Sequence, residues 1–166
     1  MIRTIGILSD THLNSAGKLF QEQVTACFGS VDLVLHAGDL TSPSILKAFG
    51  DREVLAVHGN MCDRRSQTTL PAQRVLEIEG FTIVLLHGHA FGYSNLEERV
   101  FTAFGEADCI VYGHTHRAVC HRLGGVLFIN PGSFTAPGRH GAPPTYALLR
   151  VGEELTGEIR EVAPWP

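Results

Sequence analysis

The chain has 166 residues and a mass of 18.0 kDa, which predicts a single domain over residues 1–166. Hydrophobic residues make up 44% of it and charged residues 18%, a composition that excludes an intrinsically disordered protein. The formal net charge of −4 and the scattered Lys and Arg residues argue against a protein that coats long nucleic acids.

The apolar runs are all shorter than the ~20 residues that a membrane-spanning helix needs. The first of them meets Asp10 too soon to form a signal peptide. We therefore expect a soluble, cytoplasmic protein that does not act at a membrane.

Strands and helices alternate in the first half of the chain. Three short, mostly apolar runs predict buried strands, at residues 2–8, 32–36 and 53–58. Two runs with helical spacing lie between them, at residues 16–28 and 43–50. Ser15 is the expected N-cap of the first helix and Gly29 its end, and Pro43 is the expected start of the second. This order is typical of a parallel sheet with crossover helices.

The second half of the chain predicts a second sheet, which begins with a pair of antiparallel strands. Because apolar runs flank a short turn with glycine, hairpins are expected at residues 74–86, 119–129 and 146–162. A helix capped by Asn95 and a buried strand at residues 109–112 are expected between the first two hairpins. The predicted fold class is one α/β sandwich.

Short polar motifs follow five of the predicted strands. They are Asp10-Thr11-His12, Gly38-Asp39, Gly59-Asn60, His87-Gly88-His89 and Gly113-His114-Thr115-His116. Ligands of open α/β sheets bind beyond the carboxyl ends of the strands, so we expect these motifs to meet in one cleft. The i, i+2 spacing of Asp10 and His12 places both side chains on one face of an extended segment, as does that of His114 and His116.

The motifs offer two carboxylates, one amide oxygen and four imidazoles. These belong to Asp10, His12, Asp39, Asn60, His87, His114 and His116. Without a set of thiolates, such ligands suit Mn, Fe, Co, Ni or Zn ions. Seven ligands are too many for one ion, so we expect a dinuclear site with one bridging carboxylate. Two ions ~3.5–4 Å apart can clamp the attacking and leaving oxygens in phosphoryl transfer, which indicates a phosphoesterase.

Single members of this set have structural alternatives. Asp10 or Asn60 could be a turn or N-cap residue, and His36 and His58 are expected to be strand-end histidines that form hydrogen bonds. The metal-site hypothesis therefore depends on the whole set of motifs in this order.

These motifs resemble those of the calcineurin-like metallophosphoesterase superfamily, and within it the small phosphodiesterases of the YfcE/MJ0936 type. The resemblance covers nearly the whole chain and extends to Asn130-Pro131-Gly132-Ser133, Pro137, Arg139 and Pro144-Thr145-Tyr146. It implies a two-sheet β-sandwich flanked by helices, with the dinuclear metal site at the carboxyl ends of the strands.

The resemblance also implies how the ligands divide between the two ions. The first ion would be bound by Asp10, His12 and His116, and the second by Asn60, His87 and His114. Asp39 would bridge them. The implied reaction is hydrolysis of small phosphodiesters by a hydroxide that two divalent ions activate, with Mn the expected metal and Fe, Ni, Co or Zn the alternatives.

One departure from the larger members of the superfamily concerns the proton donor. Those members have a histidine after the Asn of the G-N motif, whereas here Met61, Cys62 and Asp63 follow Asn60. We hypothesise that His89 or Asp63 assists the leaving oxygen instead.

A closing segment is expected to bind substrate. The residues concerned are Asn130, Gly132, Ser133 and Arg139, which would orient the phosphate through backbone N–H groups and a guanidinium. A structural turn with a solvated arginine is the alternative.

Two other expectations concern function and assembly. The alternative to an enzyme is a non-catalytic interaction scaffold, like the retromer subunit of similar fold, although scaffolding alone needs no complete set of metal ligands. Exposed edges of the second sheet, where we expect the hairpin at residues 146–162, could pair in a homodimer or homotetramer.

Overall fold

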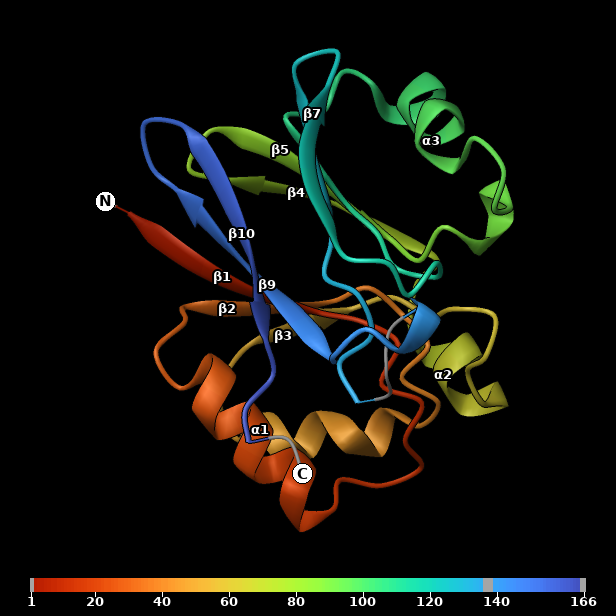
Figure 1. Ribbon diagram of the computed structural model, residues 1–166, viewed down its shortest axis with the longest axis vertical. Helices are drawn as coiled ribbons and strands as arrows, with labels where there is room; N and C mark the ends of the chain where they lie inside the picture. The colour runs from red at the N-terminus through yellow and green to blue at the C-terminus, as the bar shows by residue number, and fades with distance from the viewer. Residues whose placement is uncertain (1, 136–138, 165–166) are drawn as a thin grey trace.

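The computed structural model describes residues 2–135 and 139–164, and it contains two five-stranded sheets (Figure 1). The first sheet has the order β10-β9-β1-β2-β3, with β1 Arg3–Leu8, β2 Leu33–His36, β3 Val54–Ala56, β9 Thr145–Val151 and β10 Leu155–Glu161. The second has the order β4-β5-β6-β8-β7, with β4 Gln73–Ile78, β5 Phe81–Leu86, β6 Cys109–Val111, β7 Val119–Leu123 and β8 Val126–Asn130. The predicted two-sheet sandwich is confirmed.

The central core lies between the two sheets. It takes alternate residues of each strand, such as Ile5 and Ile7 of β1 and Ile83 and Leu85 of β5, all of which are fully buried. The remaining strand residues, such as Val34 and Val84, pack under helices on the outer faces. Because both faces of these strands are covered, the strands appear in the sequence as continuous apolar runs.

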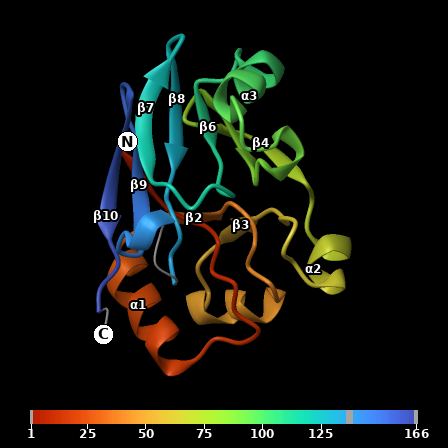
Figure 2. The same cartoon turned by 45° about the vertical axis from the view of Figure 1, so that its right-hand side comes forward.

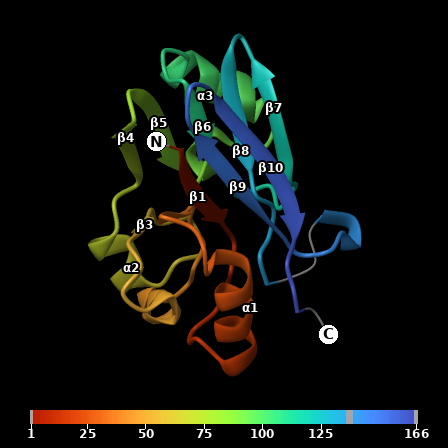
Figure 3. The ribbon, with the colours of Figure 1, turned by 90° about the vertical axis from the view of Figure 1, so that its left-hand side faces the viewer.

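Helices cover the two outer faces on opposite sides of the sandwich (Figures 2 and 3). Helix α1 (Lys18–Phe28) and the 3₁₀ helix η1 (Pro43–Phe49) pack on the first sheet, and α3 (Leu96–Phe104) packs on the second. Short helices lie in the connections: α2 Arg64–Thr69, η2 His89–Phe91 and η3 Arg139–Gly141. Within the described part of the chain, no helix is both long and apolar enough to cross a membrane.

The three predicted hairpins are confirmed as antiparallel pairs. The second sheet as a whole is mixed, because β5, β6 and β8 run parallel. One prediction about the sheets is wrong. The terminal hairpin belongs to the first sheet, where β9 pairs with β1 and β10 forms the edge. Pairing of Ile7 with Ala147 and of Ile5 with Leu149 extends the apolar inner face of the first sheet, which accounts for this placement.

The helix ends also differ in part from the predictions. Helix α1 starts two residues later than expected, with Gly17 rather than Ser15 at its N-cap. Asn95 stands at the N-cap of α3 but has left-handed backbone and accepts no capping hydrogen bond. The helix at Pro43 is confirmed as a 3₁₀ helix, whose first turn is capped by the Ser42 hydroxyl.

Candidate metal centre

The carboxyl ends of β1, β2, β5 and β6 meet at one edge of the sandwich, and backbone hydrogen bonds join the segments that leave them. The Asp10 N–H donates to the Gly38 carbonyl at 2.9 Å, and the Gly113 N–H donates to the His87 carbonyl at 3.1 Å. The His114 N–H donates to Asp10 Oδ2 at 3.1 Å, which links the β1 and β6 ends directly. The motifs predicted to converge therefore lie in one place.

Five of the expected metal ligands have left-handed backbone, which is uncommon for residues with a Cβ. Their φ angles are 53° at Asp10, 49° at His12, 53° at Asp39, 69° at His114 and 54° at His116. Such strain persists only where the surroundings fix it, and it is concentrated at functional sites.

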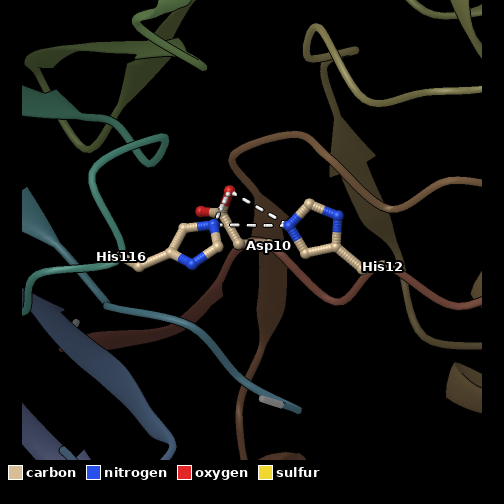
Figure 4. A group of neighbouring side chains, drawn as sticks. All are labelled: Asp10, His12 and His116. Atoms are coloured by element: carbon tan, nitrogen blue, oxygen red, sulfur yellow. Dashed lines mark hydrogen bonds and ion pairs between the residues drawn. The ribbon is translucent and has the colours of Figure 1, made fainter. Parts of the chain in front are cut away.

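Asp10, His12 and His116 form one cluster, in which Asp10 lies between the two histidines (Figure 4). Asp10 Oδ1 lies 3.1 Å from His116 Nε2 and 3.8 Å from His12 Nε2, and the two Nε2 atoms are 3.3 Å apart. Asp10 is fully buried, whereas about a third of each histidine side chain is exposed, 30% for His12 and 34% for His116. The cluster is therefore open to solvent on the histidine side.

Asp10, Asp39 and His87 form a second, fully buried cluster. His87 Nε2 lies 3.2 Å from Asp39 Oδ2 and 3.9 Å from Asp10 Oδ1. The other ring nitrogen, Nδ1, donates to the Ala37 carbonyl at 2.7 Å, so Nε2 is the nitrogen that faces the carboxylates. Asp10 is common to both clusters, and Asp39 Oδ2 lies between His87 and His12, 4.0 Å from His12 Nε2.

Two polar atoms at the centre of these clusters suit a bound cation. Asp10 Oδ1 and His87 Nε2 are buried and have no well-formed hydrogen bond among the described residues. Leaving such atoms unsatisfied is costly, and a divalent ion would satisfy both. The donor set therefore fits the metal ions that the sequence predicts.

The charges of the two carboxylates set the protonation of the nearby histidines. Burial lowers the pKa of His87, but the close contact with the Asp39 carboxylate and the charges of Asp10 and Asp39 outweigh burial, so the pKa is raised overall. The close contact with the Asp10 carboxylate raises the pKa of His116. The pKa of Asp39 is lowered, because its contacts with His87 outweigh the effect of burial. These histidines lose their protons when they bind a metal ion.

His114 and Asn60, the other two expected ligands, lie beside the clusters. The His114 ring lies 5.3 Å from the His87 ring and stacks on Tyr93 at 4.2 Å, and its pKa is lowered by burial and by His87. Asn60 is exposed and precedes Met61, whose N–H donates to Asp39 Oδ1 at 2.7 Å. The roles of His114 and Asn60 as ligands stay predictions.

His89 and Asp63, the two expected proton donors, have different surroundings. The His89 ring lies 5.5 Å from the His87 ring and 6.2 Å from the His58 ring, and its buried Nδ1 has no hydrogen-bond partner among the described residues. Asp63 instead caps helix α2, accepting a hydrogen bond from the Ser66 N–H at 2.7 Å that lowers its pKa. This bonding disfavours Asp63 as a proton donor.

The expected substrate-binding residues form internal hydrogen bonds. Asn130 Nδ2 donates to the Gly113 carbonyl at 2.9 Å, and its Oδ1 accepts from the Gly132 N–H at 3.0 Å. The Ser133 hydroxyl donates to the Asp10 carbonyl at 3.0 Å, and both polar side chains are fully buried. These bonds favour the structural turn over phosphate binding. Pro137 and the Arg139 side chain lie outside the described residues.

His36 is a hydrogen-bonded histidine at the end of a strand, as predicted. Its Nδ1 accepts from the Gly38 N–H at 3.2 Å, so its Nε2 can donate to the Thr11 hydroxyl at 3.1 Å. Tyr93 lies near the site, but no sequence motif predicts this. It belongs to a loop, and only the packing of its ring on His114 links it to the site.

Comparison with known proteins shows the family. A family model described as the calcineurin-like phosphoesterase superfamily domain matches residues 4–154. The chain belongs to this superfamily. The predicted family is thereby confirmed, together with the metallophosphoesterase fold.

Three similar proteins illustrate the range of the superfamily. The chain is 38% identical to a probable metallophosphoesterase of Methanothermobacter thermautotrophicus over 161 residues, which cover 93% of this chain and 90% of that protein. It is 38% identical to the phosphodiesterase YfcE of Escherichia coli over 104 residues, which cover 58% of this chain and 52% of YfcE. The structure of Vps29 complexed with Zn²⁺, from Entamoeba histolytica, matches with a TM-score of 0.69 at 25% identity, covering 95% of this chain and 98% of that chain.

Proposed function

We propose that this metallophosphoesterase is a metal-dependent phosphodiesterase that hydrolyses small phosphodiesters. The observation that carries the proposal is the pair of clusters that share Asp10, with Asp10 Oδ1 and His87 Nε2 buried and unsatisfied between them. The similarity to YfcE, which is named a phosphodiesterase, supports the choice of diesters.

Two divalent ions are the cofactors of the proposed enzyme, with Mn²⁺ the expected ion and Fe, Ni, Co or Zn the alternatives. When bound, they would lower the pKa of water and stabilise the negative charge that develops on the phosphate oxygens. Asp10, His12 and His116 would bind one ion, and Asn60, His87 and His114 the other, with Asp39 between them.

The chain's own contribution is to fix the donors before a metal ion arrives. The hydrogen bond from His87 Nδ1 to the Ala37 carbonyl fixes the ring and its tautomer, so Nε2 faces Asp39. The Met61 N–H fixes Asp39 by occupying Oδ1, which leaves Oδ2 directed at the histidines. Preorganised donors lower the cost of binding an ion.

His89 is the stronger of the two candidates for assisting the leaving oxygen. Its ring lies beside the His87 and His114 rings, and its Nδ1 is free of any described protein partner. We expect His89→Ala to slow hydrolysis of a diester with a poor leaving group and to change the pH dependence of the rate. His121→Ala, an exposed histidine paired with Glu97, is the control. An unchanged rate and pH profile in His89→Ala would exclude this role.

The overall function is tested with bis-p-nitrophenyl phosphate and added Mn²⁺, beside the p-nitrophenyl monoester. We expect diester hydrolysis that disappears with a chelator and in Asp39→Asn, because both remove the metal centre. If the diester stays intact with each of the five metals, the enzyme proposal fails. The non-catalytic interaction scaffold then becomes the better hypothesis, and a search for a protein partner would follow.

A further inference from the structure

The segment Asn130–Thr135, here named the bracing segment, starts at the last residue of β8 and forms hydrogen bonds with two of the strand ends that carry metal ligands. Its partners are residues 9–11 after β1 and residues 113–115 after β6. Asn130 and Ser133 are both fully buried. The bracing segment therefore touches the backbone on either side of the metal centre.

The contacts with the β6 end pass through Asn130. Its Nδ2 donates to the Gly113 carbonyl at 2.9 Å and to the Thr115 hydroxyl at 3.0 Å. Thr115 stands between His114 and His116, both of which have left-handed backbone. One amide group thus fixes the segment that supplies two of the expected ligands.

The contacts with the β1 end involve the other half of the bracing segment. The Ser133 hydroxyl donates to the Asp10 carbonyl at 3.0 Å, and the Phe134 N–H donates to the Ser9 carbonyl at 3.1 Å. The Thr135 hydroxyl donates to the Thr11 carbonyl. These bonds fix the backbone around Asp10, which is itself left-handed and needs such support.

The Asp39–His87 pair is fixed by other groups. His87 is oriented by the Ala37 carbonyl and Asp39 by the Met61 N–H, and among the described contacts none joins the bracing segment to either side chain. The bracing segment therefore supports Asp10 and the segment that carries His114 and His116, whereas Asp39 and the His87 ring have supports of their own.

We propose that Asn130 and Ser133 are positioning residues that set the affinity of the Asp10–His12–His116 cluster for a divalent ion. The inference rests on the proposed function, because it needs a metal centre. Hydrogen-bond partners one step removed from a metal ion typically change its affinity ~10–100-fold. The loss is expected to be larger at one of the two bound ions, because Asp39 and the His87 ring have separate supports.

The test is a Co²⁺ titration of chelator-treated protein, followed by calorimetry and by the visible spectrum of the bound ion. The wild type, Ser133→Ala and Asn130→Ala are compared with Gln23→Ala. Gln23 is an equally buried amide that donates to the Pro164 carbonyl at 2.9 Å, on helix α1. The melting temperature of each metal-free variant is measured as well.

We expect the wild type to bind two equivalents of Co²⁺. In Ser133→Ala and Asn130→Ala we expect a loss of ~10–100-fold in affinity at one equivalent, larger than the loss at the other, with a changed spectrum. Gln23→Ala is expected to lower the melting temperature without changing either affinity. If Asn130→Ala fails to fold, the inference is tested with Ser133→Ala and with Thr115→Val, which removes the hydroxyl that accepts from Asn130. Unchanged Co²⁺ affinities, or equal losses at both equivalents, would overturn the inference. A wild type that binds no Co²⁺ would overturn the proposed function and the inference together.

Discussion

Left-handed backbone occurs at both ends of the sandwich, but it falls on different residues. In the β4–β5 and β7–β8 turns, away from the metal centre, it falls on three glycines and on one residue with a Cβ, Glu79. At the edge where the carboxyl ends of β1, β2, β5 and β6 meet, here called the metal edge, it falls on glycines and also on five aspartate and histidine residues, such as Asp10 and His116. Glycine adopts this conformation freely, whereas residues with a Cβ need support from their surroundings. The difference shows that the metal edge accepts strain in order to place ligand side chains.

The largest effect is expected from removing the carboxylate that both clusters share. Asp10→Asn should lose bound metal and lower kcat/KM for the diester by at least about 10³-fold, because the charged Oδ1 is lost from both clusters. Asp32→Asn is the control, since that carboxylate also accepts a backbone hydrogen bond, from the Thr4 N–H, but at the other end of the strands. Steady-state kinetics and metal analysis measure the effect, and a loss below tenfold in Asp10→Asn would contradict the assignment.

Acid should lower the free energy of unfolding through His36, the last residue of β2. Burial lowers the pKa of His36 from 6.5 to about 4, so between these values the unfolded chain binds a proton that the folded chain does not. His36 therefore contributes stability that is present above pH 6.5 and is lost as the pH falls toward 4, on the order of 3 kcal/mol in total. Denaturant unfolding of metal-free protein across this range measures it.

A matched variant isolates the contribution of His36. His36→Asn can still accept from the Gly38 N–H and does not titrate, so its unfolding free energy should depend less on pH than that of the wild type. The same pH dependence in both proteins would contradict the account.

Binding of Mn²⁺ at the metal centre should raise the free energy of unfolding. At a free concentration of 100 times Kd, an ion that binds only the folded chain adds about 2.7 kcal/mol. We expect thermal unfolding to show this gain in the wild type, its removal by a chelator, and no gain in Asp10→Asn. An equal gain in Asp10→Asn would mean that Mn²⁺ binds elsewhere on the chain.

The smallest effect is expected at the opposite end. The methyl group that Gly125→Ala adds has no atom within 4 Å, so the substitution tests the left-handed backbone alone. It should lower the free energy of unfolding by about 1–2 kcal/mol. Metal affinity should not change, because the β7–β8 turn lies away from the ligands. Urea unfolding and a Co²⁺ titration measure the two quantities, and a changed affinity would break the contrast between the two ends.

The sequence predicts the elements of the metal edge well because they obey local rules. Apolar runs covered on both faces mark the strands, and the polar motifs that follow them meet because parallel strands end at the same edge. The motifs of Asp10 and His116 could thus be expected to meet, although more than a hundred residues separate them in the chain. The grouping of Asp10, His12 and His116 around one ion is implied by the resemblance to the superfamily, and the structure places the three side chains together.

Other features depend on distant contacts that a pattern does not show. The placement of the terminal hairpin follows from the pairing of β9 with β1, and a turn pattern carries no information about that partner. Helix α2 has no apolar residue in Arg64–Thr69 and depends on the Asp63 cap. Asn130 looks like a phosphate-binding turn residue in the sequence, and only its bonds to Gly113 and Thr115 indicate the bracing role.

The central claim is that two ions bind between Asp10 and its neighbours, and anomalous diffraction from crystals soaked in Mn²⁺ tests it most directly. The account predicts two anomalous peaks ~3.5–4 Å apart, one beside Asp10, His12 and His116 and the other beside Asp39 and His87. A single peak, or peaks remote from Asp10, would contradict it.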